Sequence, residues 1–366
     1  MMMTADLPAF RFDPSQTPVA ANERAARLVD PGFGRVFTDH MALIRFTEGK
    51  GWHDAQITAR APLTVDPSTA VLHYAQEIFE GLKAYRLDDG DIALFRADAN
   101  ARRFRDSARR LAMPELPDAL FLESCRRLVA TERDWIPSID GGALYLRPFM
   151  IASEAFLGVK PSAEYIYMVI ASSVGAYWKG GARAVSIWVS QEYSRAAPGG
   201  TGAAKCGGNY AASLAAQSEA IRQGCDQVVF LDAVERRWIE ELGGMNIFFV
   251  FDDGSLVTPP LTGTILPGIT RDSIIRIARD QGITVREELY SLDQWRTDAA
   301  SGRLTEAFAC GTAAVVTPIG TVASPEGRFT IGSGGTGQLT QRMLDSLTAI
   351  QRGRIAEPHG WLQRLG

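Results

Sequence analysis

The sequence has few of the residues that build metal sites and disulfide frameworks. Its 366 residues include only four histidines and four cysteines, and none of the cysteines forms a CxxC pair. Structural zinc ligands usually come in closely spaced pairs, so we expect no metal site. A disulfide framework among Cys125, Cys206, Cys225 and Cys310 is not expected in a chain of this length.

An excess of charge of one sign is also lacking, as are long apolar runs. Lys and Arg number 38 and Asp and Glu number 42, a net charge of −4, which argues against a nucleic-acid partner. We interpret the arginines from Arg102 to Arg110 mostly as the solvated face of a helix. No apolar run approaches the roughly 20 residues that span a bilayer, and the first residues lack a secretion signal. We expect a cytoplasmic protein without a membrane partner.

The pattern of apolar residues predicts an α+β fold of two domains. We expect strands at 92–95, 165–171, 185–189, 227–231 and 247–251, and helices at 100–111, 120–131 and from a cap at Thr270 to about Gly282. The glycines and the change in polarity at 175–184 indicate an interdomain loop. It would separate a smaller domain, 1–174, from a larger domain, 185–366, that carries Lys205.

A single lysine lies within a run of small residues, GGTGAAKCGGNY, from Gly199 to Tyr210. Small residues allow the backbone to approach a flat ligand closely. A lysine shielded from bulk water there would become a usable amine nucleophile. The alternative is an ordinary solvated Lys205 on a flexible surface loop, and the loop alone favours neither.

A second glycine-rich run, from Gly332 to Gly337, fits the pattern G-x-G-x-x-G. A dinucleotide site would also need a following helix and then a second strand with an acidic residue. Too few residues follow Gly337 for that arrangement, so we interpret this run as a plain loop.

Three further segments contain groups that a phosphorylated, electron-withdrawing ring would need. Glu240 and Glu241 precede a glycine turn; 260–268 leads into the helix predicted near Thr270; and 310–314 forms a Gly-Thr turn. Backbone amides at a helix start can bind a phosphate. A lysine, an anion site and a carboxylate are the groups that pyridoxal phosphate requires, although each segment alone is a weak signal.

The ordered motifs GGTGAAKCGGNY, EELGGMN, LTGTILPGITR and FACGTAAVV resemble those of the fold-type IV aminotransferases. Adding IFEGLKAYR and LYLRPF makes the sequence similar to the branched-chain amino-acid aminotransferases. The resemblance runs from about Arg35 to Arg354. It implies a two-domain architecture with pyridoxal 5'-phosphate between the domains.

The resemblance also assigns cofactor roles. Lys205 would form the Schiff base and move the proton, and Tyr210 would bond the ring oxygen. Glu241 would hold the pyridine nitrogen, with Glu240 as the adjacent alternative. Arg103 would bind the phosphate, with Arg102 as the neighbour that could be confused with it. The remaining phosphate ligands would be the amides of Thr264 and Ile265 together with Thr312.

The substrate side follows from the same resemblance. Alternation along a strand places Tyr145 and Arg147 on one face, where Arg147 would hold the distal carboxylate of the second substrate. An unrelated ion pair beside a core tyrosine is the alternative. The resemblance implies that Tyr74, Phe79 and Tyr177 form aromatic walls around the substrate and that the Ala313 amide binds its α-carboxylate. Gly244 is a further implied substrate residue, at a position where some members have Thr. Leu157 and Val159 would reach the site of a partner subunit in a homodimer. Ala314 and Thr317 stand where some members carry a CxxC redox pair, so that switch is not expected.

These features predict reversible, ping-pong transamination. L-leucine, L-isoleucine or L-valine would give its amino group to 2-oxoglutarate, leaving a branched-chain 2-oxo acid and L-glutamate. The alternatives are a D-amino-acid aminotransferase or an aminodeoxychorismate lyase of the same fold, and a non-catalytic ligand-binding protein. The intact set of Lys205, Tyr210 and Glu241 favours an enzyme over the last.

Overall fold

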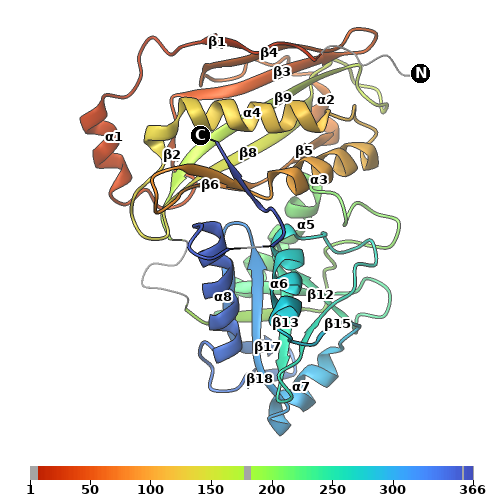
Figure 1. Ribbon diagram of the computed structural model, residues 1–366. Helices are drawn as coiled ribbons and strands as arrows, with labels where there is room; N and C mark the ends of the chain where they lie inside the picture. Colours follow the sequence, from red (N-terminus) through yellow and green to blue (C-terminus); the bar gives the residue numbers. More distant parts are fainter. Residues whose placement is uncertain (1–6, 177–182, 357, 366) are drawn as a thin grey trace. The chain divides into compact units, whose positions relative to one another are not determined.

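The computed structural model describes residues 7–176, 183–356 and 358–365. Contacts divide the chain into two compact units. The first comprises Met1–Tyr177, Ala204–Gly207 and Gln351–Gly366, and the second comprises Trp178–Ala203 and Gly208–Ile350. Both contain helices and strands (Figure 1), which confirms the predicted α+β class.

The first unit is built on a sheet that has 10 strands within the described residues, in the order β1-β4-β3-β9-β8-β6-β7-β19, with β2 beside β9 and β5 beside β8. The strands are β1 (Arg11–Asp13), β2 (Val36–Phe37), β3 (His40–Thr47), β4 (Gly51–Ala59), β5 (Glu77–Phe79), β6 (Leu82–Arg86), β7 (Ile92–Phe95), β8 (Ala143–Ala152), β9 (Glu164–Val174) and β19 (Leu362–Arg364). Its helices are α1 (Ala21–Leu28), α2 (Ala70–Tyr74), α3 (Ala97–Arg110), α4 (Asp118–Thr131) and the short 3-10 helix η1 (Arg133–Trp135).

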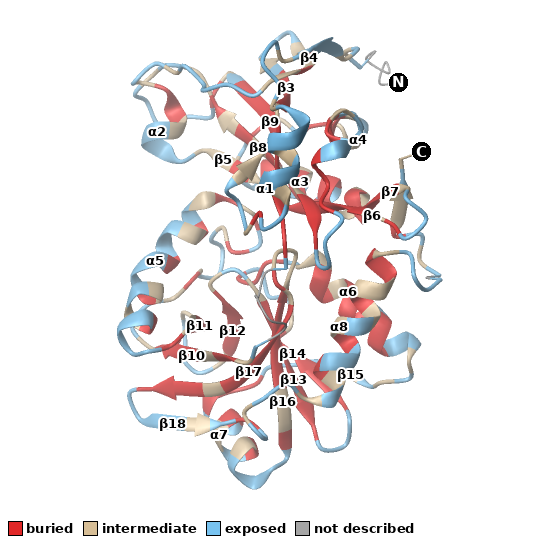
Figure 2. Ribbon diagram, turned by 90° about the vertical axis from the view of Figure 1, so that its left-hand side faces the viewer, coloured by how far each residue is buried: buried red, intermediate tan, exposed pale blue. Residues whose placement is uncertain are grey.

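Helices α3 and α4 pack together, and α4 covers β3, β8 and β9 (Figure 1). Phe104 of α3, Phe121 of α4 and Tyr167 of β9 form a buried ring cluster with centroids 5.5–6.2 Å apart. By contrast, α1 has no buried residue and is coloured as exposed in Figure 2. The core of this unit therefore lies between the sheet and the α3–α4 pair.

The second unit contains a mixed sheet that has nine strands within the described residues, in the order β12-β11-β10-β17-β16-β13-β14-β15, with β18 beside β17. The strands are β10 (Val185–Ser190), β11 (Gln227–Leu231), β12 (Ile239–Leu242), β13 (Asn246–Phe251), β14 (Leu256–Thr258), β15 (Val285–Glu287), β16 (Leu304–Gly311), β17 (Val315–Ser324) and β18 (Gly327–Thr330). The helices are α5 (Gly207–Arg222), α6 (Ile269–Asp280), α7 (Leu292–Ser301) and α8 (Gln338–Gln351). Most of its strands are buried over most of their length (Figure 2), whereas β15 and β18 contain no buried residue.

The predicted strands and helices are present, with shifts at their ends. The strands at 92–95 and 227–231 match β7 and β11, whereas the helix predicted from residue 100 begins at Ala97. Thr270 is not the cap of α6, because the helix begins at Ile269 with Gly268 before it. Within the described residues, no helix is long and apolar enough to cross a membrane.

Two segments expected in the larger domain instead contact the first unit. The backbone around Lys205 is bonded to the first unit, and its neighbours Ala204 and Cys206 are part of that unit's core. Near the C-terminus, β19 pairs antiparallel with β7, and Arg352 donates to the carbonyl oxygen of Gly142 at 2.6 Å. These are long-range contacts, which a local sequence pattern does not report.

Candidate active site

Two hydrogen bonds, one from the amide of Lys205 and one to its carbonyl, hold its backbone in place. Its amide donates to the hydroxyl of Ser107 at 2.9 Å, and its carbonyl accepts from the amide of Phe79 at 2.9 Å. The side chain is half-buried, and its Nζ lies 4.8 Å from the centroid of the Phe79 ring. Lys205 is therefore not the solvated lysine of a flexible loop, which was the alternative left open by the sequence.

The glycine-rich run before Lys205 is tied down as well. Thr201 and Asn209 exchange two hydrogen bonds, of 2.7 and 2.8 Å, which join the run to the first turn of α5. A Cβ added at Gly202 would collide with the carbonyl oxygen of Thr264. Glycine is needed here because the two backbone segments approach so closely.

Arg103 is buried in an ion pair with Glu80. Its Nε and Nη2 donate to the two carboxylate oxygens of Glu80 at 2.7 and 2.9 Å. Glu80 is fully buried and also accepts from Asn100 at 2.6 Å and from the Gly81 amide at 3.0 Å. Burial opposes the charge of Glu80, but Arg103, Lys205 and Asn100 together outweigh burial and lower the pKa of this carboxyl group. The neighbouring Arg102 instead forms an exposed pair with Asp98.

Tyr145 and Arg147 lie on one face of β8, as their spacing predicts. The Arg147 Nη2 donates to the Tyr145 hydroxyl at 3.2 Å. The Arg147 Cζ lies 4.9 Å from the Phe79 ring centroid, so Arg147 and Lys205 both contact that ring. A Cβ at Gly81 would collide with the Tyr145 hydroxyl, which fixes the position of that phenol. The first unit thus brings Lys205, Phe79, Tyr145 and Arg147 together.

Tyr74 and Leu157, two other predicted substrate residues, contact each other at the surface. The Tyr74 hydroxyl donates to the Leu157 carbonyl at 2.5 Å. Leu157 is 69% exposed and Val159 is 90% exposed. Tyr177 lies outside the described residues.

Glu241 is the centre of a buried network in the second unit. One carboxylate oxygen forms an ion pair with Arg195 at 2.8 Å and accepts from the Leu266 amide at 2.7 Å. Arg195 also donates to the Thr264 carbonyl at 2.8 Å. Both charged side chains are almost completely buried. An arginine at this distance stabilises the ionised carboxylate, which a charged ring-nitrogen partner requires.

Glu240, the adjacent alternative, has different surroundings. It accepts a hydrogen bond from the Thr264 hydroxyl, and burial raises its pKa. Within the described residues, its second oxygen is buried without a hydrogen-bond partner. Of these two acids, Glu241 is the one that forms an ion pair with a buried arginine in the described residues.

The other predicted residues of the second unit lie on neighbouring turns. Thr264 and Ile265 are buried in the loop before α6, and Thr312 and Ala313 are half-buried in the turn between β16 and β17. A Cβ at Gly244 would lie 3.4 Å from the Tyr210 ring, and one at Gly311 would lie 3.4 Å from Met245. Tyr210, Gly244 and the 311–313 turn therefore form a local group.

Three residues in these networks were not assigned from the sequence: Glu80, Ser107 and Arg195. Glu80 lies inside the quoted motif IFEGLKAYR, which was a usable signal. Ser107 is one turn along α3 from Arg103, on the same face. Arg195 precedes the glycine-rich run, and nothing in its local pattern indicates that it contacts Glu241.

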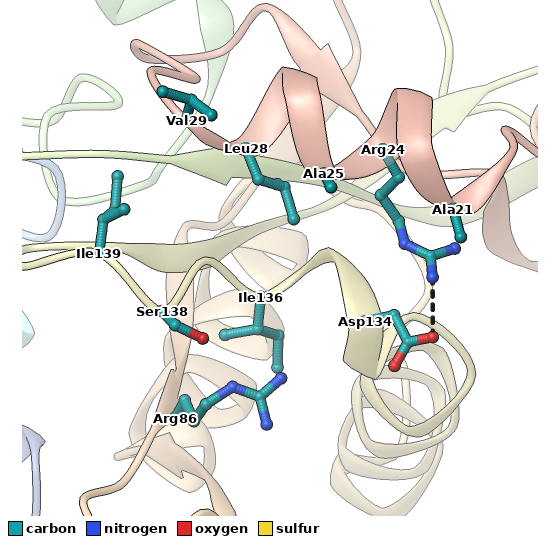
Figure 3. Close-up of a pocket in the computed structure, with 10 residues that line it drawn as sticks. All are labelled: Ala21, Arg24, Ala25, Leu28, Val29, Arg86, Asp134, Ile136, Ser138 and Ile139. Carbon is teal, nitrogen blue, oxygen red and sulfur yellow. Dashed lines mark hydrogen bonds and ion pairs between the residues drawn. The ribbon is translucent and has the colours of Figure 1, made fainter.

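A separate hollow of about 550 Å³ lies beside α1 (Figure 3). Arg24 is paired with Asp134 at 2.9 Å on its wall, and Leu28 and Ile136 point into it. Among the described residues, none of the predicted site residues lines it.

Comparison with known proteins was consistent across sequence and structure. The family model described as amino-transferase class IV matches residues 77–322. The chain is 57% identical over 359 residues to a probable branched-chain-amino-acid aminotransferase of Streptomyces coelicolor, covering 98% of this chain and 99% of that one. It is 58% identical to the branched-chain-amino-acid aminotransferase of Mycobacterium tuberculosis, covering 95% and 96%.

Solved structures agree. A branched-chain amino acid aminotransferase from Escherichia coli aligns with a TM-score of 0.71 at 31% identity, covering 89% of this chain and 99% of that one. A T.th. branched-chain amino acid aminotransferase with pyridoxamine 5'-phosphate aligns with a TM-score of 0.73 at 30% identity, covering 89% and 99%. The chain belongs to the class IV aminotransferases and, within them, to the branched-chain-amino-acid aminotransferases.

Proposed function

We propose that the protein transfers amino groups between L-leucine, L-isoleucine or L-valine and 2-oxoglutarate, with pyridoxal 5'-phosphate as cofactor. One observation carries this proposal: Lys205 Nζ and Arg147 Cζ lie 4.8 and 4.9 Å from the same Phe79 ring centroid. A nucleophilic amine and a carboxylate-binding guanidinium thus flank an apolar surface. Such a surface can accept an aliphatic side chain, and the guanidinium can pair with a distal carboxylate.

Each unit contains residues of the kinds that the cofactor requires. In the first unit, Lys205 would hold it covalently and Arg103 would bind its phosphate. In the second unit, the amides of Thr264 and Ile265 and the hydroxyl of Thr312 would bind the phosphate, Glu241, which is paired with Arg195, would hold the ring nitrogen, and Tyr210 would hold the ring oxygen. When bound, pyridoxal phosphate supplies a carbonyl that accepts the amino group and a ring that withdraws electrons.

The remaining steps belong to the side chains of this protein. The Lys205 amine would take the proton from the substrate α-carbon and deliver it to the reacting carbon of the cofactor. The hydrogen bonds to Ser107 and Phe79 hold the backbone from which that amine extends. Phe79 and Tyr145 would exclude water around the aliphatic chain, and the Ala313 amide would bind the α-carboxylate.

Substitution of Lys205 tests the catalytic assignment. In Lys205→Ala we expect no cofactor to be retained after borohydride treatment, with turnover reduced on the order of 10²- to 10⁴-fold or more. Lys50→Ala, at an exposed position, is the control and should behave as wild type. Retention of both properties in Lys205→Ala would contradict the assignment.

The two adjacent acids can be separated by the same change. Glu241→Gln should keep the cofactor but abstract the substrate proton much more slowly, because the ring loses its charged partner. Glu240→Gln should have little effect on this step. The reverse ranking would assign the role to Glu240.

A substrate panel tests the reaction itself. We expect rapid turnover of L-leucine with 2-oxoglutarate, and little with D-alanine or aminodeoxychorismate. Dominant activity on either of the latter two would favour the other members of this fold. Absence of cofactor absorbance after added pyridoxal phosphate would favour a binding protein.

We also propose a homodimer and a cytoplasmic location. Four apolar side chains of the first unit are exposed on two segments that the hydrogen bond from Tyr74 to Leu157 joins, a pattern typical of interaction sites: Leu72, Tyr74, Leu157 and Val159. All four cysteines are unpaired, as in a reducing compartment. Leu157→Asp should convert dimers to monomers in sedimentation, whereas Val234→Asp, exposed in the second unit, should not. Dimers in both variants, or cofractionation with membranes, would contradict these proposals.

A further inference from the structure

One face of α3 holds two groups of the candidate active site. Asn100 and Arg103 both donate to the buried carboxylate of Glu80. Ser107, one turn further along, accepts from the amide of Lys205 at 2.9 Å. Spacings of three and four residues place the three helix side chains on the same face. The position of α3 therefore sets the positions of Arg103 and of the Lys205 backbone.

Arg96, the residue before α3, has an unusual backbone conformation. Its φ of 54° and ψ of 36° lie in the left-handed region, which is unfavourable for a residue other than glycine. Its carbonyl accepts from the amides of Ala99 and Asn100 at 3.0 and 3.3 Å, so the first turn of the helix is built on this conformation. The Arg96 side chain forms no capping hydrogen bond. Another contact must therefore hold Arg96 in place.

Trp361, in the C-terminal segment, contacts Arg96 through both its backbone and its ring. The Arg96 amide donates to the Trp361 carbonyl at 2.8 Å, and the Arg96 Cζ lies 4.9 Å from the Trp361 ring centroid. Both residues are buried, so water weakens the attraction between guanidinium and indole only slightly. The ring also packs against Phe95 with centroids 5.7 Å apart, and β19 pairs with β7, which ends at Phe95. The C-terminal segment thus holds the start of α3 from outside the helix.

We propose that Trp361 is a positioning residue for the cofactor site. Its carbonyl and its ring hold Arg96 in the left-handed conformation, which fixes the start of α3. The helix then presents Arg103 to Glu80 and Ser107 to Lys205. This inference rests on the proposed function, since it takes Arg103 and Lys205 as cofactor ligands. It gives the C-terminal segment a role in the affinity for pyridoxal 5'-phosphate.

Two substitutions of Arg96 separate the backbone conformation from the charge. Arg96→Met and Arg96→Gly both remove the guanidinium, but glycine adopts a positive φ readily. In Arg96→Met the conformation that binds the cofactor becomes a minor one. We therefore expect the Kd for pyridoxal 5'-phosphate, measured by absorbance titration of the full chain, to rise on the order of tenfold. In Arg96→Gly this Kd should stay within about threefold of wild type. An equal rise in both variants would overturn the proposal, because the charge and not the backbone would then matter.

Substitution of Trp361 tests the source of the restraint. Trp361→Ala should raise the same Kd on the order of tenfold, and adding Arg96→Gly should return it to within about threefold of wild type. The urea midpoint of this double variant should stay below that of wild type, because the space left by the indole remains. Recovery of affinity without recovery of stability would distinguish positioning from a purely structural role. Arg364→Ala, which removes an exposed side chain of β19, is the control and should leave the Kd unchanged.

A wild-type Kd in Trp361→Ala, or no recovery in the double variant, would overturn the role of Trp361. The comparison of Arg96→Met with Arg96→Gly decides the proposal even if Trp361→Ala does not fold. If the wild-type chain shows no absorbance change with pyridoxal 5'-phosphate at all, the proposed function fails instead, so the two failures can be told apart.

Discussion

Replacement of Arg103 by Met should destabilise the protein far more than the same change at Arg102. Arg103→Met leaves Glu80 fully buried with only Asn100 and the Gly81 amide as donors. Breaking a buried ion pair from one side typically costs about 3–5 kcal/mol. Arg102 forms an exposed pair with Asp98, four residues away, and such pairs contribute about 0–1 kcal/mol. The difference in the free energy of unfolding should therefore be about 2–5 kcal/mol.

Urea denaturation of both variants, without added cofactor, measures this difference. The double variant Arg103→Met/Glu80→Met separates the structural role from the ligand role. Because it removes both buried charges, it should recover most of the lost stability. If Arg103 also binds the phosphate, the recovered protein should still retain pyridoxal phosphate poorly. Equal costs for Arg102→Met and Arg103→Met would refute the reasoning from burial, and normal cofactor retention in the double variant would refute the phosphate assignment.

Two further predictions concern a buried lysine and the cap of a helix. Burial lowers the pKa of Lys83 from 10.5 to about 8, so its charge destabilises the folded state below pH 8 and this penalty disappears as the pH rises towards 10.5. Lys83→Met should therefore be more stable than wild type by up to about 3 kcal/mol at pH 7. In urea titrations this difference in stability should disappear by pH 10.5. A difference that does not depend on pH would contradict the prediction. Glu306 accepts hydrogen bonds from the Leu339 and Thr340 amides at 3.0 and 2.8 Å and so caps α8. Glu306→Ala should therefore lower the free energy of unfolding by about 1–2 kcal/mol. A thermal midpoint equal to that of wild type would argue against the cap.

The cap on α8 also explains the second glycine-rich run. The loop from Gly332 to Gly337 is followed by α8, as a dinucleotide loop would be followed by a helix. However, the carboxylate of Glu306 occupies the amides of the first turn, and a Cβ at Gly337 would collide with it. An acid at this position repels a phosphate, so the interpretation as a plain loop agrees with the structure.

Local elements could be predicted where the periodicity was strong. The strands at 92–95 and 227–231 are short apolar runs with clear ends, and both agree with the structure. The placement of 204–207 and 351–366 could not be predicted in the same way. It depends on β19 pairing with β7 and on the bonds of Lys205 to Ser107 and Phe79, which join positions far apart in the sequence.

The site shows the same division between local and long-range information. Motifs pointed to Lys205, Glu241 and Arg103 because each lies at a fixed place in a recognisable run. Glu80 lies in a quoted motif but was not assigned, and Arg195 has no local signal, because the roles of both depend on which side chains meet after folding. The preference for Glu241 over Glu240 now has a physical argument, namely the ion pair that Glu241 forms with Arg195.

These partners share one physical role. A lone charge in a buried site is costly, so a site that awaits charged ligands needs internal compensation. Glu80 compensates Arg103, and Arg195 compensates Glu241. Each of these two charges is thereby stable before any ligand arrives, but the ligand must then share its binding group with a resident partner. Affinity for the cofactor should consequently respond to Glu80 and Arg195 as well as to Arg103 and Glu241, and variants of the two partners can change that affinity while the binding groups stay intact.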